Sequence, residues 1–321
     1  MGMNKIETRT VGPDDSGQRL DRWLRRSFGR LPQSKIEGLC RKGMIRIGDA
    51  RAKPSDRLQE GQTVRLPVSL DFAPRNHPSQ GFPQSIKIPP WFQSTILYQD
   101  SDIIVFDKPP GIAVQGGTGQ RRHLAGYASA CFATKDSTPK LIHRLDKETS
   151  GLLVMARNRR AACALSEDFR LRRVTKLYLA IVHGCPKVTS GCIESEMWVQ
   201  ETDKTKTAFT NYEVIDGLGQ KLALVALKPL TGRNHQLRIH LADMGHPIVG
   251  DRQYGKRIHD GSLHSGRRMM LHAGLLEFSH PGNGETRRFH APLPPHMRRR
   301  FQLLGWDDKQ LDFGTLAECH A

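Results

Sequence analysis

Several features are missing or scarce in this chain, and each absence excludes a class of protein. The six cysteines form no CxxC pair, and their spacing predicts neither a zinc site nor a disulfide framework. No apolar run approaches the roughly 20 residues that a membrane-spanning helix needs, and residues 1–15 contain no apolar core typical of a signal peptide. We therefore expect a cytoplasmic protein with reduced thiols that does not associate with a membrane.

Acidic residues are also few. The chain has 32 Asp and Glu against 49 Lys and Arg, which leaves a net charge of +17. An excess of this size favours a polyanionic partner, because Lys and Arg release condensed counterions when they contact phosphates. Hydrophobic residues make up 37% of the 321 residues, enough for one large or two ordinary folded domains.

The sequence pattern of residues 17–67 predicts a small domain with two helices and a small sheet. A second helix should begin near Ser34, where Glu37 completes a capping box, and should end at Gly43. Short strands are expected at residues 44–47 and 63–66. The first helix is indicated by apolar side chains at helical spacing: Leu20, Trp23, Leu24 and Phe28.

Residues 68–92 are rich in proline and serine and should form a linker, since proline cannot complete a strand ladder. Residues 93–300 then predict a larger domain of strands and helices. Its expected strands are 95–98, 103–106, 152–156, 174–182, 222–227, 269–273 and 275–278, with further short strands in 185–220 separated by turns at Gly191, Asp203 and Gly217–Gly219. Its expected helices are 122–133, 159–170 and a segment around Leu237–Met244 that stops at Gly245.

The stretch 141–158, LIHRLDKETSGLLVMARN, organises the larger domain. Charged residues lead through Gly151 into the apolar run 152–156, which is typical of a strand buried on both faces. Asp146 lies between cations just before that strand, where a rigid support could hold a reactive group. The local pattern alone favours the simpler interpretation, a structural ion pair.

The residues His143–Gly151 resemble the HRLDxxTSG signature of the large-subunit ribosomal RNA pseudouridine synthases, in which the aspartate is catalytic. Three other segments are similar to motifs of this family in the same order. Residues 107–117 resemble NKPxGxxVHxG, with Asp107 for Asn and Gln115 for His; residues 176–184 resemble KxYxAxVxG; and residues 230–240 resemble LxTGRxHQIRxH. The resemblance covers residues 94–295, and residues 17–67 resemble an S4-type RNA-binding domain.

The resemblance implies an α+β pseudouridine synthase fold, with a mixed, largely antiparallel sheet and an active-site cleft across it. It implies that Asp146 is the catalytic nucleophile or base, and that Arg233 faces it. A facing arginine keeps a buried carboxylate charged and oriented. Tyr178 should lie against the uracil ring, although a tyrosine in an apolar strand would otherwise be assigned to the core.

The resemblance also suggests which residues contact RNA. Arg144 should enter the space that an extracted base leaves, or contact a phosphate. Lys176 should contact phosphate or form a salt bridge. The arginine-rich face of the small domain is the other candidate, unless it is an ordinary solvated helix face. The candidates there are Arg19, Arg22, Arg25, Arg26, Lys35, Arg41 and Lys42.

We expect no metal or cofactor. His143, His235, His240 and His246 lack zinc-site spacing and are interpreted as structural hydrogen-bonding residues. Isomerisation of uridine oxidises nothing and consumes no energy carrier, which agrees with the lack of Walker and Rossmann motifs.

The predicted function is isomerisation of uridine to pseudouridine in large-subunit rRNA by a monomeric enzyme. The S4-like domain favours rRNA, because tRNA-directed relatives often lack it. A tRNA pseudouridine synthase is the alternative enzyme, and a catalytically silent RNA-binding ribosome-assembly factor is the alternative of another class.

Overall fold

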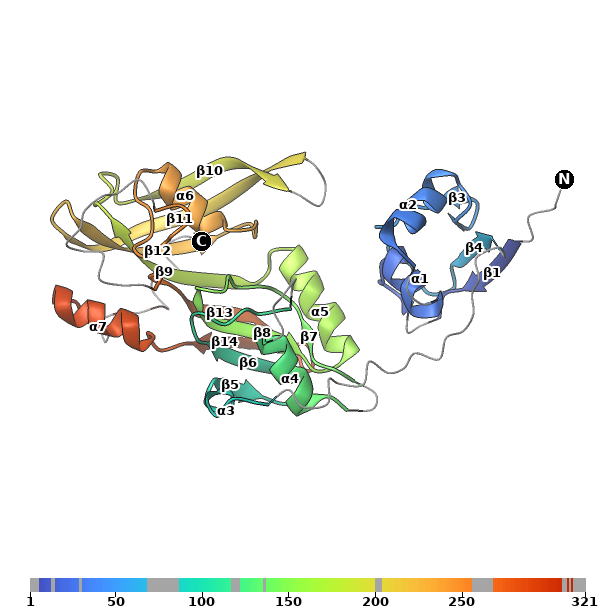
Figure 1. Cartoon of the computed structure of the whole chain (residues 1–321), viewed down its shortest axis with the longest axis horizontal. Coiled ribbons are helices and arrows are strands. Elements are labelled where there is room, and N and C mark those ends of the chain that lie inside the picture. Colours follow the sequence, from blue (N-terminus) through green and yellow to red (C-terminus); the bar gives the residue numbers. More distant parts are fainter. Residues whose placement is uncertain are drawn as a thin grey trace. The chain divides into compact units, whose positions relative to one another are not determined.

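The computed structural model describes residues 6–12, 15–28, 31–67, 87–116, 122–134, 137–199, 204–255, 268–307, 311 and 313. The chain divides into two compact units, Met1–Ser85 and Ile86–Ala321. Their helices and strands are labelled in Figure 1. Among the described residues, no helix has the length and apolarity to cross a membrane.

The N-terminal unit contains two helices and a four-stranded antiparallel sheet. The helices are α1 (Leu20–Phe28) and α2 (Gln33–Arg41). The sheet has the order β1 (Ile6–Thr10), β4 (Thr63–Pro67), β2 (Arg46–Ile47) and β3 (Ala50–Arg51). The predicted stripe of α1 is buried together with Ile36, Ile45, Val64 and Leu66, so the helical spacing correctly identified the core face.

Two details of this unit differ from the prediction. The unit begins before residue 17, because β1 pairs along its whole length with β4. The capping box is wrong: Pro32 is the N-cap of α2, and no side chain caps that end. Gly43 ends the helix as expected, with a positive φ of 68°. The assignment of this unit to the S4 type stays a prediction.

Most of the predicted linker lies outside the described residues, but its end belongs to the second unit. Helix α3 (Trp91–Ser94) begins there, and Phe92 is fully buried against Phe106 and Tyr127. The boundary of the larger domain therefore precedes residue 93.

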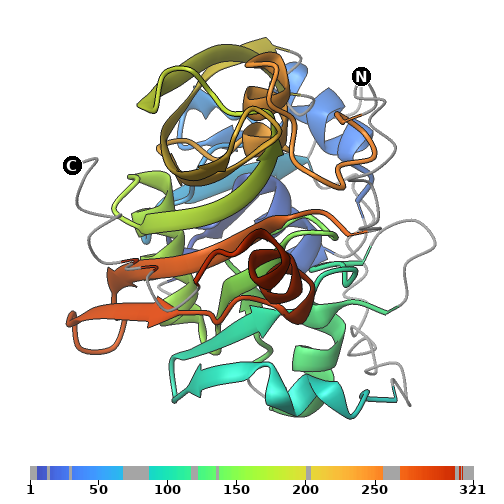
Figure 2. The same ribbon diagram turned by 90° about the vertical axis from the view of Figure 1, so that its left-hand side faces the viewer.

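The second unit is built on a ten-stranded sheet, which Figures 1 and 2 show from two directions. Its main order is β10-β11-β12-β9-β13-β8-β6-β5, with β14 paired to β13 and β7 to β8. Strands β8 and β13 are parallel and all other pairs are antiparallel, which confirms the mixed, largely antiparallel sheet. The strands are β5 (Ile96–Gln99), β6 (Ile103–Lys108), β7 (Lys140–Leu141), β8 (Ser150–Ala156), β9 (Thr175–His183), β10 (Ser190–Val199), β11 (Lys204–Leu218), β12 (Leu222–Pro229), β13 (Leu271–Ser279) and β14 (Thr286–His290).

Helices cover both faces of the sheet around β8, because alternate residues of a strand point to opposite sides. Leu153 and Met155 pack with α4 (Leu124–Phe132), whereas Leu152 and Val154 pack with α5 (Arg159–Arg170). All seven residues of β8 are buried, so the prediction of a strand buried on both faces is confirmed. The remaining helices are α6 (Gln236–Asp243) and α7 (Pro295–Leu304).

The prediction for residues 185–220 is only partly right. Instead of several short strands, β10 and β11 form one long antiparallel hairpin, and Gly191 and Gly217 lie inside its strands. The predicted turn at the end of this segment is confirmed at Gly219, which has a φ of 55° and connects β11 to β12. The predicted turn at Asp203 lies outside the described residues. The two predicted strands 269–273 and 275–278 are one strand, β13, whose register shifts at Gly274. Strand β14 and helix α7 were not predicted, and α7 extends past residue 300 with Phe301 packed in the core.

Candidate active site

Asp146 lies in the loop between β7 and β8, immediately before the buried strand. Its backbone carbonyl accepts a hydrogen bond from Thr149 N at 3.2 Å, which closes a tight turn. Gly151 follows with a φ of 105°, and a Cβ atom there would lie 2.2 Å from the carbonyl oxygen of Ala273 on β13. Only glycine therefore allows β8 to approach β13 at this point, and this close approach fixes the end of the Asp146 loop.

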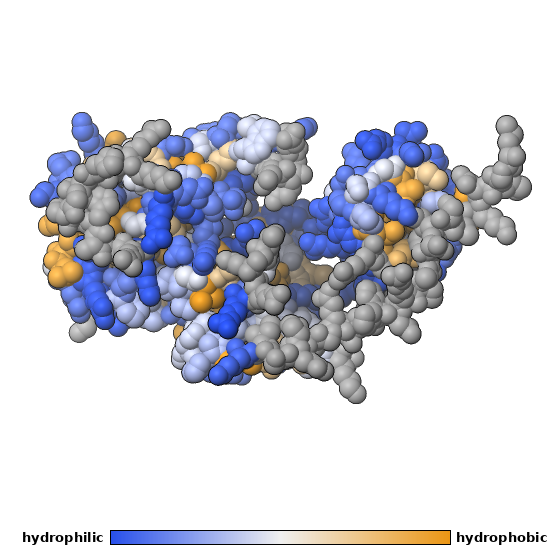
Figure 3. Space-filling view, in the orientation of Figure 1, coloured by the Kyte–Doolittle hydropathy of each residue, from blue (hydrophilic) through white to orange (hydrophobic). Residues whose placement is uncertain are grey.

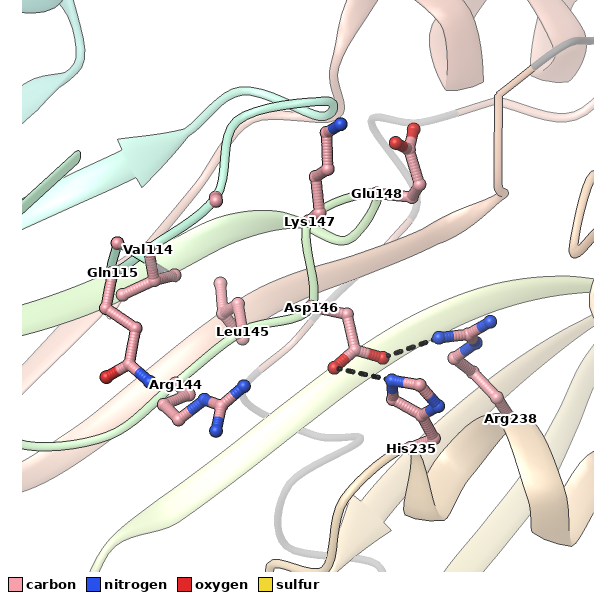
Figure 4. Close-up of a pocket in the computed structure, with 11 residues that line it drawn as sticks. Val114, Gln115, Arg144, Leu145, Asp146, Lys147, Glu148, His235 and Arg238 are labelled. Carbon is pink, nitrogen blue, oxygen red and sulfur yellow. Dashed lines mark hydrogen bonds and ion pairs between the residues drawn. The ribbon is translucent and has the colours of Figure 1, made fainter. Parts of the chain in front are cut away.

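An open cavity of about 350 Å³ surrounds the Asp146 side chain. In Figure 4 that side chain points toward His235 and Arg238, while Lys147 and Glu148 point away from it. The exposed side chains of Gln115 and Arg144 lie on another side of the cavity. The lining residues are Ala113, Val114, Gln115, Gly116, Arg144, Leu145, Asp146, Lys147, Glu148, His235 and Arg238.

Arg238, and not Arg233, forms the ion pair with Asp146. Nη1 of Arg238 lies 3.1 Å from Oδ2 of Asp146. Arg233 makes no ion pair with Asp146, and its buried Nε has no hydrogen-bond partner among the described residues. Arg238 lies in the first turn of α6, whereas Arg233 lies in the loop before that helix, where its backbone N–H donates to Gln236 Oε1 at 3.0 Å. The predicted pairing is thus corrected to a residue five positions further along the same motif.

Asp251 holds Arg238 in place. Its two carboxylate oxygens accept hydrogen bonds from Nε and Nη2 of Arg238 at 2.6 and 3.0 Å, and its side chain is fully buried. Burial would lower the pKa of Arg238, but the hydrogen bonds with Asp251 and Asp146 outweigh it and raise that pKa above its ordinary value. Burial would likewise raise the pKa of Asp251, but hydrogen bonds from Arg238 and from backbone N–H groups lower it. The guanidinium is therefore a fixed cation that links two carboxylates.

His235 approaches the other oxygen of Asp146. Its Nε2 lies 3.8 Å from Oδ1, and its Nδ1 lies 3.0 Å from the hydroxyl of Tyr254. The other three histidines form structural hydrogen bonds as expected. Nε2 of His143 accepts from Val154 N, His240 contacts Ser195 Oγ, and His246 contacts the carbonyl of His183.

Tyr178 lies on β9, close enough to Asp146 to be influenced by its charge. Burial, and then the negative charge of Asp146, raise the pKa of the Tyr178 hydroxyl above its ordinary value. The tyrosine packs between two hydrophobic clusters and is not part of the cavity lining. Lys176 lies two residues earlier on the same strand, and burial, together with the charge of Arg172, lowers its pKa to about 8.

Lys108 is a site residue that sequence analysis missed. It is fully buried, and its Nζ donates to the carbonyls of Pro109, Ile112 and Lys147 at 3.0 to 3.1 Å. It therefore ties the 109–112 loop to the loop that carries Asp146. Burial lowers its pKa to about 7, against the opposing charges of Glu148, Asp146 and Asp107. The sequence could have indicated this role, because Lys108 ends an apolar strand, and a buried ammonium group there must donate its hydrogen bonds to nearby carbonyls.

The basic residues of the N-terminal unit fall into two groups. Arg19 pairs with the buried Asp21 at 2.7 Å, Arg25 donates to Leu31 and Gln33, and Arg26 pairs with Asp15, so these three support the fold. The others are exposed, as Arg26 also is; Figure 3 shows hydrophilic residues over much of the described surface. The exposed candidates outside these three are Arg22, Lys35, Arg41 and Lys42.

One group in the described part of the chain has the spacing of a metal site: Asp100, Asp102 and His280. Its atoms already bond with one another and with neighbouring groups. Asp100 accepts from Tyr98 and from the amides of Asp102 and Ile103, and Asp102 accepts from Asn158. This arrangement is a hydrogen-bonded turn between β5 and β6, away from the residues that line the cavity.

Comparison with known proteins identifies the same region. Residues 102–243 match the family model described as RNA pseudouridylate synthase. The chain is 34% identical over 310 residues to ribosomal large subunit pseudouridine synthase C of Salmonella typhimurium, covering 92% of this chain and 95% of the relative. It is 33% identical over 315 residues to the protein of the same name in Haemophilus influenzae, covering 94% and 96%.

Solved structures agree with these sequence relatives. Human RNA pseudouridylate synthase domain containing 4 superposes with a TM-score of 0.56 at 27% identity, over 67% of this chain and 94% of that chain. Human RNA pseudouridylate synthase domain containing 1 gives 0.51 at 32% identity, over 62% and 83%.

Proposed function

The chain belongs to the RNA pseudouridylate synthase family, and on this premise we propose that it isomerises one or more uridines of large-subunit rRNA to pseudouridine. The observation that carries the proposal is the Asp146–Arg238 ion pair at the wall of an open cavity. The relatives named for the large ribosomal subunit support the choice of RNA, since they align along nearly the whole chain.

The reaction exchanges one bond to the ribose for another. The bond between N1 of uracil and C1′ breaks, a bond between C5 and C1′ forms, a proton leaves C5, and N1 gains a proton. Asp146 acts as the nucleophile at C1′ or as a base toward the sugar. Arg238 balances the charge of this carboxylate and holds one of its oxygens, so that Oδ1 is the oxygen left for the substrate.

The surroundings of Asp146 suit a base removed from an RNA stack. The cavity is within the size range of small-molecule sites. Arg144 lies exposed at its edge, where its guanidinium can occupy the vacated position in the RNA or contact a phosphate. Tyr178 on β9 does not line the cavity but lies close enough to Asp146 to be influenced by its charge, and we assign to it the ring that contacts the reacting base once RNA is bound. Lys176, on the same strand, is assigned as a cation near the RNA.

RNA affinity is assigned to the N-terminal unit as an S4-like domain, through the exposed Arg22, Lys35, Arg41 and Lys42. Arg19, Arg25 and Arg26 contribute mainly through the ion pairs and hydrogen bonds that hold this unit together. The protein is proposed to act in the cytoplasm as a monomer without a cofactor.

Two experiments test this function. Purified protein should release tritium from large-subunit rRNA transcribed with uridine labelled at C5, and Asp146→Asn should abolish release. Asp243→Asn, which changes an exposed acid on α6, is the matched control and should remain active. Release by Asp146→Asn equal to that of wild type would overturn the catalytic role of Asp146, and no release by wild type would leave an RNA-binding assembly factor.

The target is tested by mapping pseudouridine in cells with and without the gene. The loss of specific pseudouridines from large-subunit rRNA, restored by wild type but not by Asp146→Asn, is expected. Changes confined to tRNA would identify a tRNA pseudouridine synthase instead.

A further inference from the structure

His235 adopts a backbone conformation that calls for an explanation. Its φ is 54°, in the left-handed region that residues other than glycine rarely occupy. It precedes α6 directly, and its carbonyl accepts from the N–H groups of Arg238 and Ile239, each at 3.0 Å. Its side chain does not cap the helix. The conformation instead turns the imidazole into the cavity, toward Asp146 (Figure 4).

The hydroxyl of Tyr254 contacts one ring nitrogen of His235 and not the other. That hydroxyl accepts a hydrogen bond from Gln253 Nε2 at 3.2 Å, and Nδ1 of His235 lies 3.0 Å away. Among the described residues, Nδ1 is the acceptor within reach of the hydroxyl hydrogen. Burial raises the pKa of Tyr254, so the hydroxyl keeps its hydrogen at neutral pH. A hydroxyl that donates to Nδ1 requires the neutral imidazole to carry its hydrogen on Nε2, the nitrogen that faces Oδ1 of Asp146.

Asp146 thus meets a different donor at each oxygen. Arg238 Nη1 lies 3.1 Å from Oδ2, and His235 Nε2 lies 3.8 Å from Oδ1. The second distance exceeds a hydrogen bond, and catalytic contacts of this kind shorten once substrate is bound. The ring of Tyr254 also lies against Arg238, whose guanidinium carbon is 5.0 Å from the centre of that ring. One tyrosine therefore contacts both donors.

We propose that His235 is a positioning residue that acts through Asp146: held by Tyr254 as the Nε2–H tautomer, it directs Oδ1 toward the reacting sugar carbon. This rests on the proposed function. The imidazole restrains rotation of the carboxylate, so that the oxygen not held by Arg238 meets C1′ in one orientation. His235 makes no bond to the substrate in this role.

Two amide substitutions separate this role from a purely structural one. His235→Gln places an N–H donor near the position of Nε2, facing Asp146. His235→Asn places its amide near Nδ1, facing Tyr254, and leaves Asp146 without a donor. Asparagine tolerates the left-handed backbone better than glutamine does. If His235 has only a structural role, His235→Asn should therefore be the more active variant. If it positions Asp146, His235→Gln should be the more active one.

The measurement is single-turnover tritium release from large-subunit rRNA transcript at saturating protein, with RNA affinity measured by filter binding. We expect His235→Asn to lower the rate roughly tenfold or more with little change in affinity, and His235→Gln to retain most of the rate. A rate for Asn equal to or above that of Gln would overturn the proposal. So would a loss confined to affinity.

Tyr254→Phe tests the tautomer, because it removes the hydroxyl and keeps the ring beneath Arg238. It should slow wild type but have little further effect on His235→Gln, whose amide needs no tautomer control. Equal effects in both backgrounds would overturn the role of Tyr254.

Nitrogen NMR of labelled His235 at about pH 8 provides a readout that does not depend on activity. The ring hydrogen should reside on Nε2 in wild type and redistribute toward Nδ1 in Tyr254→Phe. If neither wild type nor any variant releases tritium while the NMR result holds, the proposed function fails and the tautomer assignment stands. If wild type is active and the hydrogen resides on Nδ1, the inference fails alone.

Discussion

Asp251 binds Arg238 through two nitrogens of its guanidinium and leaves the third, Nη1, facing Asp146 at 3.1 Å. The fully buried carboxylate thus orients the arginine toward the partly exposed one. The orientation of Asp146 therefore depends on Asp251, which lies 13 positions after Arg238 in the chain.

Asp251→Asn should impair catalysis through Arg238. The amide keeps the size of the side chain and can still accept from the backbone of Gln253 and Tyr254, but it removes the charge and one acceptor for the guanidinium. Breaking a buried pair by removing one partner costs roughly 3 to 5 kcal/mol. We expect a lower free energy of unfolding in urea and a lower rate of tritium release at saturating RNA. Asp243→Asn should match wild type in both measurements, and an active, equally stable Asp251→Asn would contradict the role assigned to Asp251.

Arg238→Lys and Arg233→Lys should differ sharply in activity. Lysine cannot make the paired contacts that Arg238 makes to Asp251 while also reaching Asp146, so Arg238→Lys should lose at least about 100-fold in rate. Arg233 makes no ion pair with Asp146, and Arg233→Lys should retain most of the rate at saturating RNA. Rates measured side by side under single-turnover conditions decide between them. A larger loss for Arg233→Lys would restore the pairing expected from the motif alone.

Asp107→Asn should stabilise the protein at neutral pH. Burial raises the pKa of the Asp107 carboxyl from 3.8 to about 6, although the charge of Lys108 opposes the shift. Between those values the folded chain holds a proton that the unfolded chain releases, so stability falls as pH rises from about 4 to 6 and stays lowered above it. The amide has no charge to desolvate. Because the side chain is partly exposed, we expect a gain of about 1 to 2 kcal/mol at pH 8.

Urea unfolding of wild type and Asp107→Asn at several pH values measures this difference. The gain should shrink toward pH 4 and disappear below about pH 3, where the carboxyl is protonated in the folded and unfolded states alike. A gain of equal size at every pH would indicate a new hydrogen bond of the amide and not the loss of a buried charge.

Gly151→Ala should destabilise the second unit strongly. The residue combines a φ of 105° with a predicted Cβ contact of 2.2 Å to a backbone oxygen of β13, and backbone cannot move aside as a flexible side chain can. We expect a loss of more than about 3 kcal/mol in the free energy of unfolding. Gly232→Ala, in the loop before α6, is the matched control, because a Cβ there meets nothing within 4 Å. Similar unfolding midpoints for the two variants would show that β8 can shift away from β13.

The local sequence was sufficient to predict those helices and strands whose apolar pattern fits only one kind of element. The continuous run 152–156 could bury both its faces only as a central strand, and the stripe on α1 could face only one core. The long β10–β11 hairpin escaped prediction, because its glycines resembled turns while pairing across strands kept them extended. The unpredicted strand β1 likewise depends on β4, which lies more than 50 residues further along the chain.

The motif by itself identified Asp146 as the candidate acid and placed two arginines nearby in sequence, Arg233 and Arg238. The prediction chose Arg233, and this was wrong, because the pairing depends on where α6 begins and on Asp251, which holds Arg238. Only the tertiary structure brought Asp146 and Arg238, 92 positions apart in the chain, into contact. It also assigned one carboxylate oxygen of Asp146 to Arg238 and the other to His235. Composition and periodicity constrain local conformation and burial, whereas the pairing of charges is set by distances that exist only after the chain has folded.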